Sequence, residues 1–301
     1  MNVLSLFDGI SVGQQALKEL GIINITYYAS EIDKYAISTT QKNFPNTIQL
    51  GDIKNITEEK LSKLENIDLL IGGSPCQDLS ISKKNREGLY GEKSILFFEY
   101  VRILNYIKPK YFILENVASM SKESKETISE ILKVEPLMID ACFFSAQRRK
   151  RLFWTNIKHI PHPEDENILL KDILEDKVSI KYMLEENIIN KVKYKNRLPG
   201  LNRLPGLIGY LNKGGQGDRV YSVSGKSCTL SSNGGGRGAK TGLYQIKKDT
   251  IRKLTPIECE RLQSLPDNYT YGLSDNQRYK CLGNAFNCKV IQNIIKCIDF
   301  K

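Results

Sequence analysis

Short β-rich runs alternate with helical segments over the first 120 residues of this 301-residue chain, and this alternation constrains the fold more than any other feature. The apolar runs predict strands at residues 3–7, 25–29, 47–50, 68–71 and 111–114. Helical spacing follows the first run and recurs over residues 93–107. Strands and helices that alternate in this way indicate βαβ units, so we expect an α/β fold with a doubly wound parallel sheet.

Polar and reactive side chains stand where the predicted strands end. They are Asp8, Glu31, Asp52, Cys76 and Glu115. In an open parallel sheet, ligands bind outside the carboxyl ends of the strands. These five residues are therefore candidates for a functional site.

The chain between residues 187 and 248 is basic and rich in glycine. It holds one acid, Asp218, against twelve lysines and arginines, and twelve of the 22 glycines lie between Gly200 and Gly242. A net charge of +10 suits a polyanionic partner. A linker or a solvated basic face is the alternative, but intermittent apolar residues predict a small β core, which favours contact with nucleic acid.

Three segments follow from this change of character. We expect a first domain at 1–158, an inserted basic domain at 159–250, and a segment at 251–301 that returns to the first domain. Thr255-Pro256 predicts the start of a helix. An apolar stripe over 277–300 predicts a further helix that docks on the first domain.

The cysteines and histidines argue against a disulfide framework and a metal site. The seven cysteines show no C-x-x-C spacing, and the two histidines, His159 and His162, flank a proline. No run approaches the ~18 apolar residues of a membrane helix, and the first residues have no basic n-region. We therefore expect reduced thiols, no metal and a cytoplasmic location.

Two loops and one basic cluster carry the strongest motifs. The loop Phe7-Asp8-Gly9-Ile10-Ser11, with Glu31 beyond it, fits NAD, FAD or S-adenosylmethionine, although Ser11 in place of a second glycine disfavours a dinucleotide. Cys76, in the loop Gly72-Gly73-Ser74-Pro75-Cys76-Gln77, is either a reactive thiol or a small loop residue. Strand alternation would turn Arg149 and Arg151 to one side.

In combination these pieces resemble the DNA (cytosine-5) methyltransferase family, and they occur in the family's order. The matching motifs are Phe7-Asp8-Gly9, Pro75-Cys76-Gln77, Glu115-Asn116-Val117, Gln147-x-Arg149-x-Arg151, Arg252-x-Leu254-Thr255-Pro256-x-Glu258 and Gly283-Asn284-Ala285. The resemblance covers nearly the whole chain except the basic segment. It is similar in detail to the vertebrate de novo branch, whereas the small size is typical of a bacterial or phage enzyme.

The resemblance implies a Rossmann-like S-adenosylmethionine-dependent methyltransferase sheet and a catalytic set of four residues. Cys76 would add to carbon 6 of cytosine, and Glu115 would stabilise the ring at nitrogen 3. Arg151, together with Arg149, would hold the oxygen at carbon 2. A stacked base is out of reach of such a site, so the target cytosine would be flipped out of the duplex.

The resemblance also implies a set of residues for S-adenosyl-L-methionine, with no metal. They are Phe7, Asp8, Gly9, Ile10, Ser11, Glu31, Ile32, Asp52, Ile53, Pro75, Asn284 and Ala285. Asp52 has an alternative interpretation as a helix cap or turn residue.

Double-stranded DNA would be the partner, bound by the basic domain as well as the catalytic loop. The residues expected to contact it are Ser80, Arg219, Thr229, Asn233 and Arg237. We expect a monomer. Two roles fit: modification beside a companion restriction endonuclease, or self-protection of a phage genome.

Three other functions remain as alternatives. A transfer RNA cytosine methyltransferase uses the same fold, but the long basic insert favours a DNA reader. A catalytically inactive DNA-binding module leaves Cys76, Glu115 and Arg151 unexplained, and a nicotinamide dehydrogenase leaves the Cys76 loop without a role.

Overall fold

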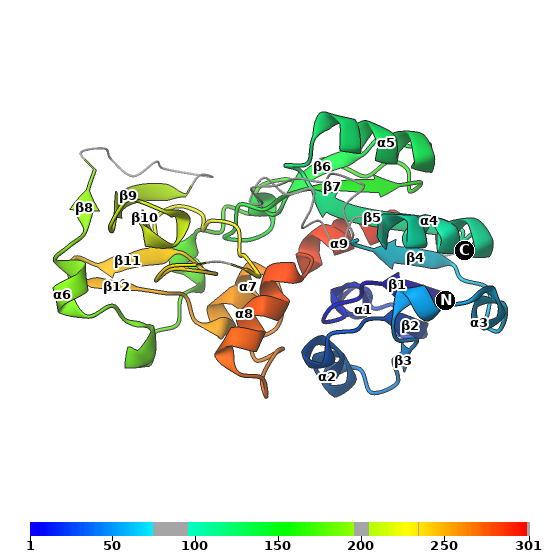
Figure 1. Ribbon diagram of the computed structural model, residues 1–301, viewed down its shortest axis with the longest axis horizontal. Helices are drawn as coiled ribbons and strands as arrows, with labels where there is room; N and C mark the ends of the chain where they lie inside the picture. The colour runs from blue at the N-terminus through cyan, green and yellow to red at the C-terminus, as the bar shows by residue number, and fades with distance from the viewer. Residues whose placement is uncertain (75–95, 196–204, 234, 300–301) are drawn as a thin grey trace. The chain divides into compact units, whose positions relative to one another are not determined.

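A computed structural model describes residues 1–74, 96–195, 205–233 and 235–299 (Figure 1). The chain forms two compact units. Unit 1 consists of Met1–Ile139, Lys150–Pro161 and Ile291–Lys301, and unit 2 of Asp140–Arg149 and His162–Val290.

Unit 1 is built on a seven-stranded sheet with the strand order β3-β2-β1-β4-β5-β7-β6 (Figure 1). The strands are β1 (Asn2–Leu6), β2 (Thr26–Ser30), β3 (Ile48–Gln49), β4 (Leu69–Gly72), β5 (Tyr111–Val117), β6 (Leu137–Asp140) and β7 (Lys150–Thr155). The pairs β1–β2, β2–β3, β1–β4 and β4–β5 are parallel, and β5 pairs with β7 antiparallel. Because β2 and β4 lie on opposite sides of β1, the sheet has the switch point of a doubly wound fold. The predicted fold class is confirmed.

Helices cover both faces of this sheet. They are α1 (Val12–Glu19), α2 (Lys34–Asn43), α3 (Glu58–Ser62), α4 (Leu96–Ile107) and α5 (Lys122–Leu132). On one face, Leu4, Leu70 and Leu114 pack with Tyr100 of α4 and Ile128 of α5. Burial on both faces explains why these strands are continuous apolar runs in the sequence.

Helix α1 covers the opposite face at close range. A Cβ atom at Gly13 would lie 2.9 Å from the Tyr27 hydroxyl and 3.2 Å from Cδ1 of Ile71. Glycine therefore lets α1 approach β2 and β4, which places the start of the helix just beyond the end of β1.

Unit 2 contains a five-stranded sheet with the order β12-β11-β10-β9-β8 (Figure 1). Its strands are β8 (Lys193–Tyr194), β9 (Gly206–Tyr210), β10 (Arg219–Ser222), β11 (Leu243–Lys247) and β12 (Thr250–Arg252), and α6 (Glu186–Ile189) precedes them. Leu211, Val220, Leu243 and Ile251 form its core. The small β core expected in the basic region is present.

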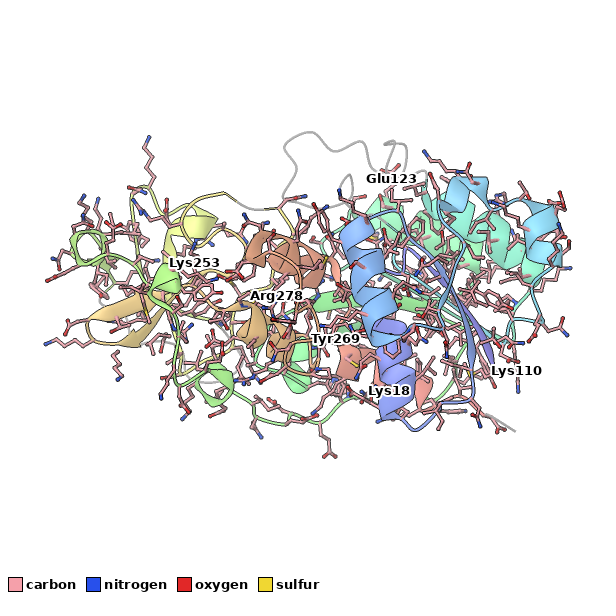
Figure 2. The ribbon with its side chains drawn as sticks, turned by 90° about the horizontal axis from the view of Figure 1, so that it is seen from below. Lys18, Lys110, Glu123, Lys253, Tyr269 and Arg278 are labelled. Carbon is pink, nitrogen blue, oxygen red and sulfur yellow. The ribbon has the colours of Figure 1, made fainter. Side chains whose placement is uncertain are left out.

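Two buried ion pairs stabilise the helices α7 (Pro256–Leu262) and α8 (Asp275–Asn284) of unit 2. Arg252 pairs with Glu258 at 2.6 Å, and Arg278, labelled in Figure 2, pairs with Glu260 at 2.8 Å. Thr255 and Glu258 form a capping box at the start of α7, where the sequence predicts a helix.

The single helix predicted over 277–300 is wrong. The chain forms α8 and a separate helix α9 (Cys288–Ile295). Ala285 is extended, with φ −67° and ψ 155°, and the side chain of Asn287 accepts the Val290 N–H at 3.2 Å. The extended backbone at Ala285 and the hydrogen bond from Val290 to Asn287 separate the two helices. An apolar stripe in the sequence does not reveal this break.

The boundaries of the two compact units differ from those of the three predicted segments. The predicted segments divide the chain by function, and that division stays a prediction. Residues 251–290 group with unit 2. Hydrogen bonds explain this: Glu258 accepts the Glu175 N–H at 2.9 Å, and Arg261 donates to the Ile173 carbonyl at 2.9 Å.

Glycines in unit 2 let two loops pack backbone to backbone. The Gly238 N–H donates to the Gly217 carbonyl at 2.6 Å, and a Cβ atom at Gly217 would lie 2.0 Å from the Gly235 carbonyl oxygen.

We expect Gly217→Ala to lower the free energy of unfolding by about 1–3 kcal/mol, because the loops must separate. Urea unfolding measures this. Gly215→Ala is the matched control, since no atom lies within 4 Å of its Cβ position; equal losses in both variants would contradict the prediction.

Across the described ranges, no helix is both long and apolar enough to cross a membrane.

Candidate active site

The loop between β1 and α1 bends sharply at the switch point of the sheet. Phe7, Gly9 and Ser11 all have positive φ values, of 57°, 60° and 56°. No atom lies within 4 Å of the position that a Cβ of Gly9 would occupy, so the backbone there borders open space. Such a loop lets a ligand approach the main chain closely.

Asp8 holds this loop from inside. Its carboxylate is buried and accepts hydrogen bonds from the hydroxyls of Ser11 and Tyr27, the latter at 2.9 Å. Burial raises the pKa of Asp8 from 3.8 to about 6. Ser11 and Ile10 are buried as well. The side chains of these three predicted cofactor residues are therefore buried beneath the loop, and their role toward a cofactor stays a prediction.

Glu31 connects the ends of β1 and β2. Its Oε2 accepts the Gly9 N–H at 2.8 Å, and its Oε1 accepts the N–H groups of Ile32 and Asp33 at 2.7 and 2.8 Å. Glu31 is half-buried, and the neighbouring Ile32 is 73% exposed. An acceptor carboxylate beside an exposed apolar side chain and an open backbone loop fits a ligand with sugar hydroxyls and an aromatic ring.

The remaining predicted cofactor residues have other local roles. The Asp52 side chain accepts the Lys54 N–H at 3.0 Å and caps a short 3₁₀ helix, in line with the alternative interpretation from the sequence. Ile53 is part of the core of unit 1. Asn284 and Ala285 belong to unit 2, where Asn284 is exposed and Ala285 is buried.

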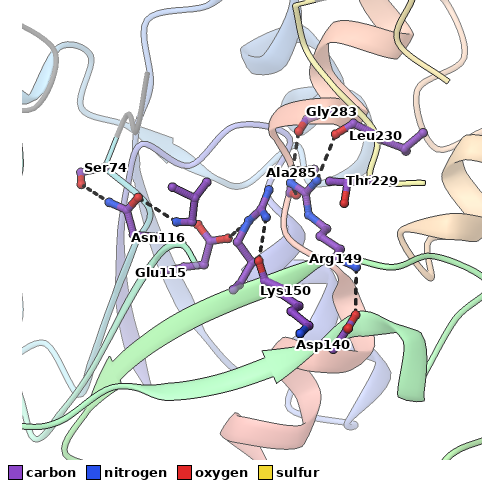
Figure 3. A network of polar contacts seen from close by, with 12 residues as sticks. Ser74, Glu115, Asn116, Asp140, Arg149, Lys150, Thr229, Leu230, Gly283 and Ala285 are labelled. Atoms are coloured by element: carbon purple, nitrogen blue, oxygen red, sulfur yellow. Dashed lines mark hydrogen bonds and ion pairs between the residues drawn. The ribbon is translucent and has the colours of Figure 1, made fainter. Parts of the chain in front are cut away.

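Glu115 and Arg151 form an ion pair near the carboxyl end of β5 (Figure 3). Nε of Arg151 lies 2.7 Å from Oε1 of Glu115, and the side chains are 16% and 12% exposed. Arg151 is opposite Val117 in the β5–β7 ladder, so Glu115 is its diagonal neighbour on the same face. The antiparallel β7 thus brings an arginine at its start to the carboxylate at the end of β5.

Asn116 links the same end of β5 to the end of β4. It is buried, and its Nδ2 donates to Oγ of Ser74 at 3.3 Å (Figure 3). Ser74 is the last described residue before the predicted catalytic loop. Pro75, Cys76 and Ser80 lie outside the described residues.

Arg149 and Arg151 have different partners. Arg149 precedes β7, so strand alternation does not govern it, and its guanidinium donates to the carbonyls of Leu230, Gly283 and Ala285 (Figure 3). Arg151 instead pairs with Glu115. The two arginines thus have different partners, and their joint place in the catalytic set stays a prediction.

The predicted DNA-contacting residues of unit 2 lie on loops and strand ends. Arg219, Asn233 and Arg237 are exposed. Thr229 is half-buried, and its hydroxyl donates to the Arg148 carbonyl at 2.5 Å. Thr229 is thus engaged with its own chain, and so in part is Arg219, whose Nε donates to the Gly214 carbonyl at 3.3 Å.

Sequence reasoning missed three residues that support this site: Tyr27, Ser74 and Asn116. Asn116 and Ser74 stand inside the quoted motifs, so their position next to Glu115 and Cys76 was the available signal. Tyr27 gave none, because its contact with Asp8 joins residues 19 positions apart.

Asp8 makes a specific pH dependence testable. Since its pKa is raised, the folded protein keeps the proton to a higher pH than the unfolded chain. Its contribution to stability is therefore greatest below about pH 4 and is lost as the pH rises to about 6. The pKa difference corresponds to about 3 kcal/mol. We expect the unfolding free energy of the wild type, relative to Asp8→Asn, to fall by about 2 kcal/mol between pH 4 and 7 in urea titrations. Parallel pH curves would refute the assignment.

Within the described part of the chain, no group of three or more His, Cys, Asp or Glu side chains is placed to hold a metal ion. The six described cysteines are free thiols.

Comparison with known proteins decides the family. The sequence model described as C-5 cytosine-specific DNA methylase matches residues 1–299. The chain belongs to this family. The methylase is 32% identical over 326 residues to the Type II methyltransferase M.HhaI of Haemophilus parahaemolyticus, covering 100% of this chain and 96% of that protein. It is 31% identical to the Type II methyltransferase M.HpaII of Haemophilus parainfluenzae, covering 96% of this chain and 86% of that protein. The methylase is thus a DNA (cytosine-5-)-methyltransferase.

Solved structures confirm the fold of the methylase. The Entamoeba histolytica methyltransferase EhMeth superimposes with a TM-score of 0.73 at 20% identity, covering 99% of this chain and 97% of that one. S. pombe Dnmt2 gives a TM-score of 0.72 at 19% identity, covering 98% and 97%. The fold is therefore the Rossmann-like fold of methyltransferases.

Proposed function

We propose that this methylase transfers a methyl group from S-adenosyl-L-methionine to carbon 5 of a flipped-out cytosine in a short DNA sequence, through a covalent bond to Cys76. The observation that carries the proposal is the Glu115–Arg151 ion pair. It lies at the end of the strand whose Asn116 anchors Ser74, two residues before Cys76 in the sequence.

The loop at the end of β1 supports the choice of cofactor. Gly9 offers open backbone, Glu31 offers acceptor oxygens for ribose hydroxyls, and exposed Ile32 offers an apolar surface for adenine. S-adenosyl-L-methionine supplies an electrophilic methyl group when bound. The other residues of the proposed cofactor set are Phe7, Asp8, Ile10, Ser11, Asp52, Ile53, Pro75, Asn284 and Ala285.

The residues at the end of β5 support the chemistry of the base. The thiolate of Cys76 forms a bond to carbon 6, and the ring electrons move to carbon 5, which becomes nucleophilic. Glu115 holds a proton at nitrogen 3 and so stabilises the charge that the addition creates. Arg151 fixes the Glu115 carboxylate and contacts the oxygen at carbon 2. Carbon 5 would then take the methyl group, with S-adenosyl-L-homocysteine as the leaving group. Loss of the carbon 5 proton to a base afterwards breaks the bond between carbon 6 and sulfur and releases the thiolate.

Unit 2 would supply DNA binding. Exposed Arg219, Asn233 and Arg237 lie in a region with one acid and twelve basic residues. Contacts to phosphates offset the few kcal/mol that unstacking a base costs. Arginines on such loops favour guanine edges.

The relatives suggest two biological settings. M.HhaI and M.HpaII are named Type II methyltransferases, and a 26% identical relative is the Orphan methyltransferase M.SPRI of Bacillus phage SPR. We propose modification in a restriction system, with self-protection of a phage genome as the other setting.

Bisulfite sequencing of DNA from cells that express the methylase tests the proposal. We expect complete protection of one cytosine within a recurrent short sequence, and none in cells that express Cys76→Ala. Methyl incorporation into transfer RNA, measured in parallel with duplex DNA, should stay at background. Incorporation into transfer RNA without any into DNA would overturn the proposal.

A further inference from the structure

Three segments of unit 2 that are distant in the sequence meet at the Arg149 side chain (Figure 3). Its Nη1 donates to the Leu230 carbonyl at 3.3 Å, and its Nη2 donates to the carbonyls of Gly283 and Ala285 at 3.1 and 2.8 Å. Arg149 is 3% exposed. A buried guanidinium shared among three carbonyls acts as a cross-link between backbones.

Gln147 binds the backbone of the same residue, Leu230, through its N–H group. Its Oε1 accepts the Leu230 N–H at 2.9 Å, and its Nε2 donates to the Leu262 carbonyl at 3.2 Å. Both polar groups of the Leu230 backbone are therefore bonded to buried side chains of one motif. This leaves the peptide at position 230 little freedom to shift.

Gly283 brings the backbones into direct contact. A Cβ atom at this position would lie 2.4 Å from the Ser232 nitrogen and 2.5 Å from the Ser231 carbonyl carbon. These are main-chain atoms, which a side-chain rotation cannot move aside. Glycine is thus required where the end of α8 packs against residues 231–232.

The segment held in this way leads into exposed polar side chains. We call residues 230–233 and 235–237 the recognition loop; it includes exposed Asn233 and Arg237. Its base, at Leu230–Ser232, is fixed to the end of α8, and its polar part faces solvent. That is the arrangement of a reader loop on a rigid support.

We infer that Arg149 is a positioning residue that, with Gln147 and Gly283, docks the recognition loop on the C-terminal end of α8 and thereby sets DNA site discrimination. The inference rests on the proposed function, since the loop is taken to read DNA. It separates Arg149 from Arg151: Arg149 acts through the loop, whereas Arg151 acts at the reacting base.

Kinetics of Arg149→Lys and Gly283→Ala test the inference. A lysine ammonium cannot span three carbonyls as a guanidinium does, and Gly283→Ala pushes the same loop away while keeping all of the Arg149 donors. For both variants we expect KM for the cognate duplex to rise at least tenfold and discrimination against one-base-altered sites to fall at least tenfold. The fall in kcat at saturating DNA should be smaller than either of these two changes.

Arg278→Lys is the matched control. Arg278, labelled in Figure 2, is also a buried arginine of unit 2. Its partners, however, are Glu260 and Thr270. We expect it to lower the melting temperature without changing discrimination. If Arg278→Lys changed discrimination as much as Arg149→Lys, general destabilisation would explain the effect. A fall in kcat with unchanged KM and discrimination would instead place Arg149 at the reacting base. Either result overturns the inference.

Hydrogen exchange on the unaltered methylase tests, without any variant, whether Leu230 is held by Arg149 and Gln147. We expect the amide of Leu230 to exchange at least a hundredfold more slowly than those of Asn233 and Arg237. Equal rates would overturn the inference even in an active enzyme. A wild type that protects the Leu230 amide but methylates no DNA would overturn the proposed function, while the docking of the recognition loop on α8 would still stand.

Discussion

Cys76→Ala abolishes methyl transfer, with an expected loss in kcat of more than about 10⁴-fold. Carbon 5 of cytosine is a poor nucleophile, and without a thiolate on carbon 6 the ring electrons stay delocalised. Alanine is close to cysteine in size, so binding of DNA and cofactor should persist. The measurement is incorporation of labelled methyl groups into duplex DNA, together with gel-shift affinity.

Trapping the covalent adduct between Cys76 and the target base tests the same assignment without a measurement of turnover. A duplex with 5-fluorocytosine at the target should become covalently joined to the wild type, because fluorine cannot leave as a proton does. Cys297→Ala is the matched control, since Cys297 is a free, half-buried thiol in unit 1. Adduct formation by Cys76→Ala, or its loss in Cys297→Ala, would refute the assignment.

Glu115→Gln should lower kcat by about 10²–10⁴-fold, with little change in KM for DNA. Glutamine keeps the shape of the side chain, but it cannot hold the proton at nitrogen 3 and leaves the Arg151 guanidinium without the carboxylate that lies 2.7 Å away. Single-turnover rates at saturating DNA measure the effect.

Two further variants sharpen this result. Glu123→Gln, on the exposed surface of α5, should leave kcat unchanged. Because Glu115 and Arg151 act as one unit, E115Q/R151Q should lose little more activity than the worse single variant. Fully additive losses would show that the ion pair has no joint role in the reaction.

Local pattern predicted the sheet well. The strands predicted at residues 25–29 and 111–114 correspond to β2 and β5, because a doubly wound sheet buries each strand on both faces and makes it a continuous apolar run. The same reasoning placed Arg151 correctly, since it lies inside β7 and obeys strand alternation. It does not reveal the partners of Arg149, which stands one residue before the strand and is held by hydrogen bonds to residues distant in the sequence.

Burial and long-range contact set the limits of prediction in the cofactor loop. Motif position marks Asp8 and Ser11 as loop residues, but it does not reveal that they bond to each other beneath the loop. The break between α8 and α9 depends in the same way on Ala285, whose carbonyl is bonded by Arg149, 136 residues away.

The antiparallel pairing of β5 with β7 also restricts how this enzyme can vary among lineages. Insertions between Val117 and Leu137 would lengthen a connection and leave the ladder alone. A single inserted residue at the start of β7 would turn Arg151 through the sheet to the other side, away from Glu115. We therefore expect insertions and deletions among related enzymes to be tolerated before β7 and to be selected against within it.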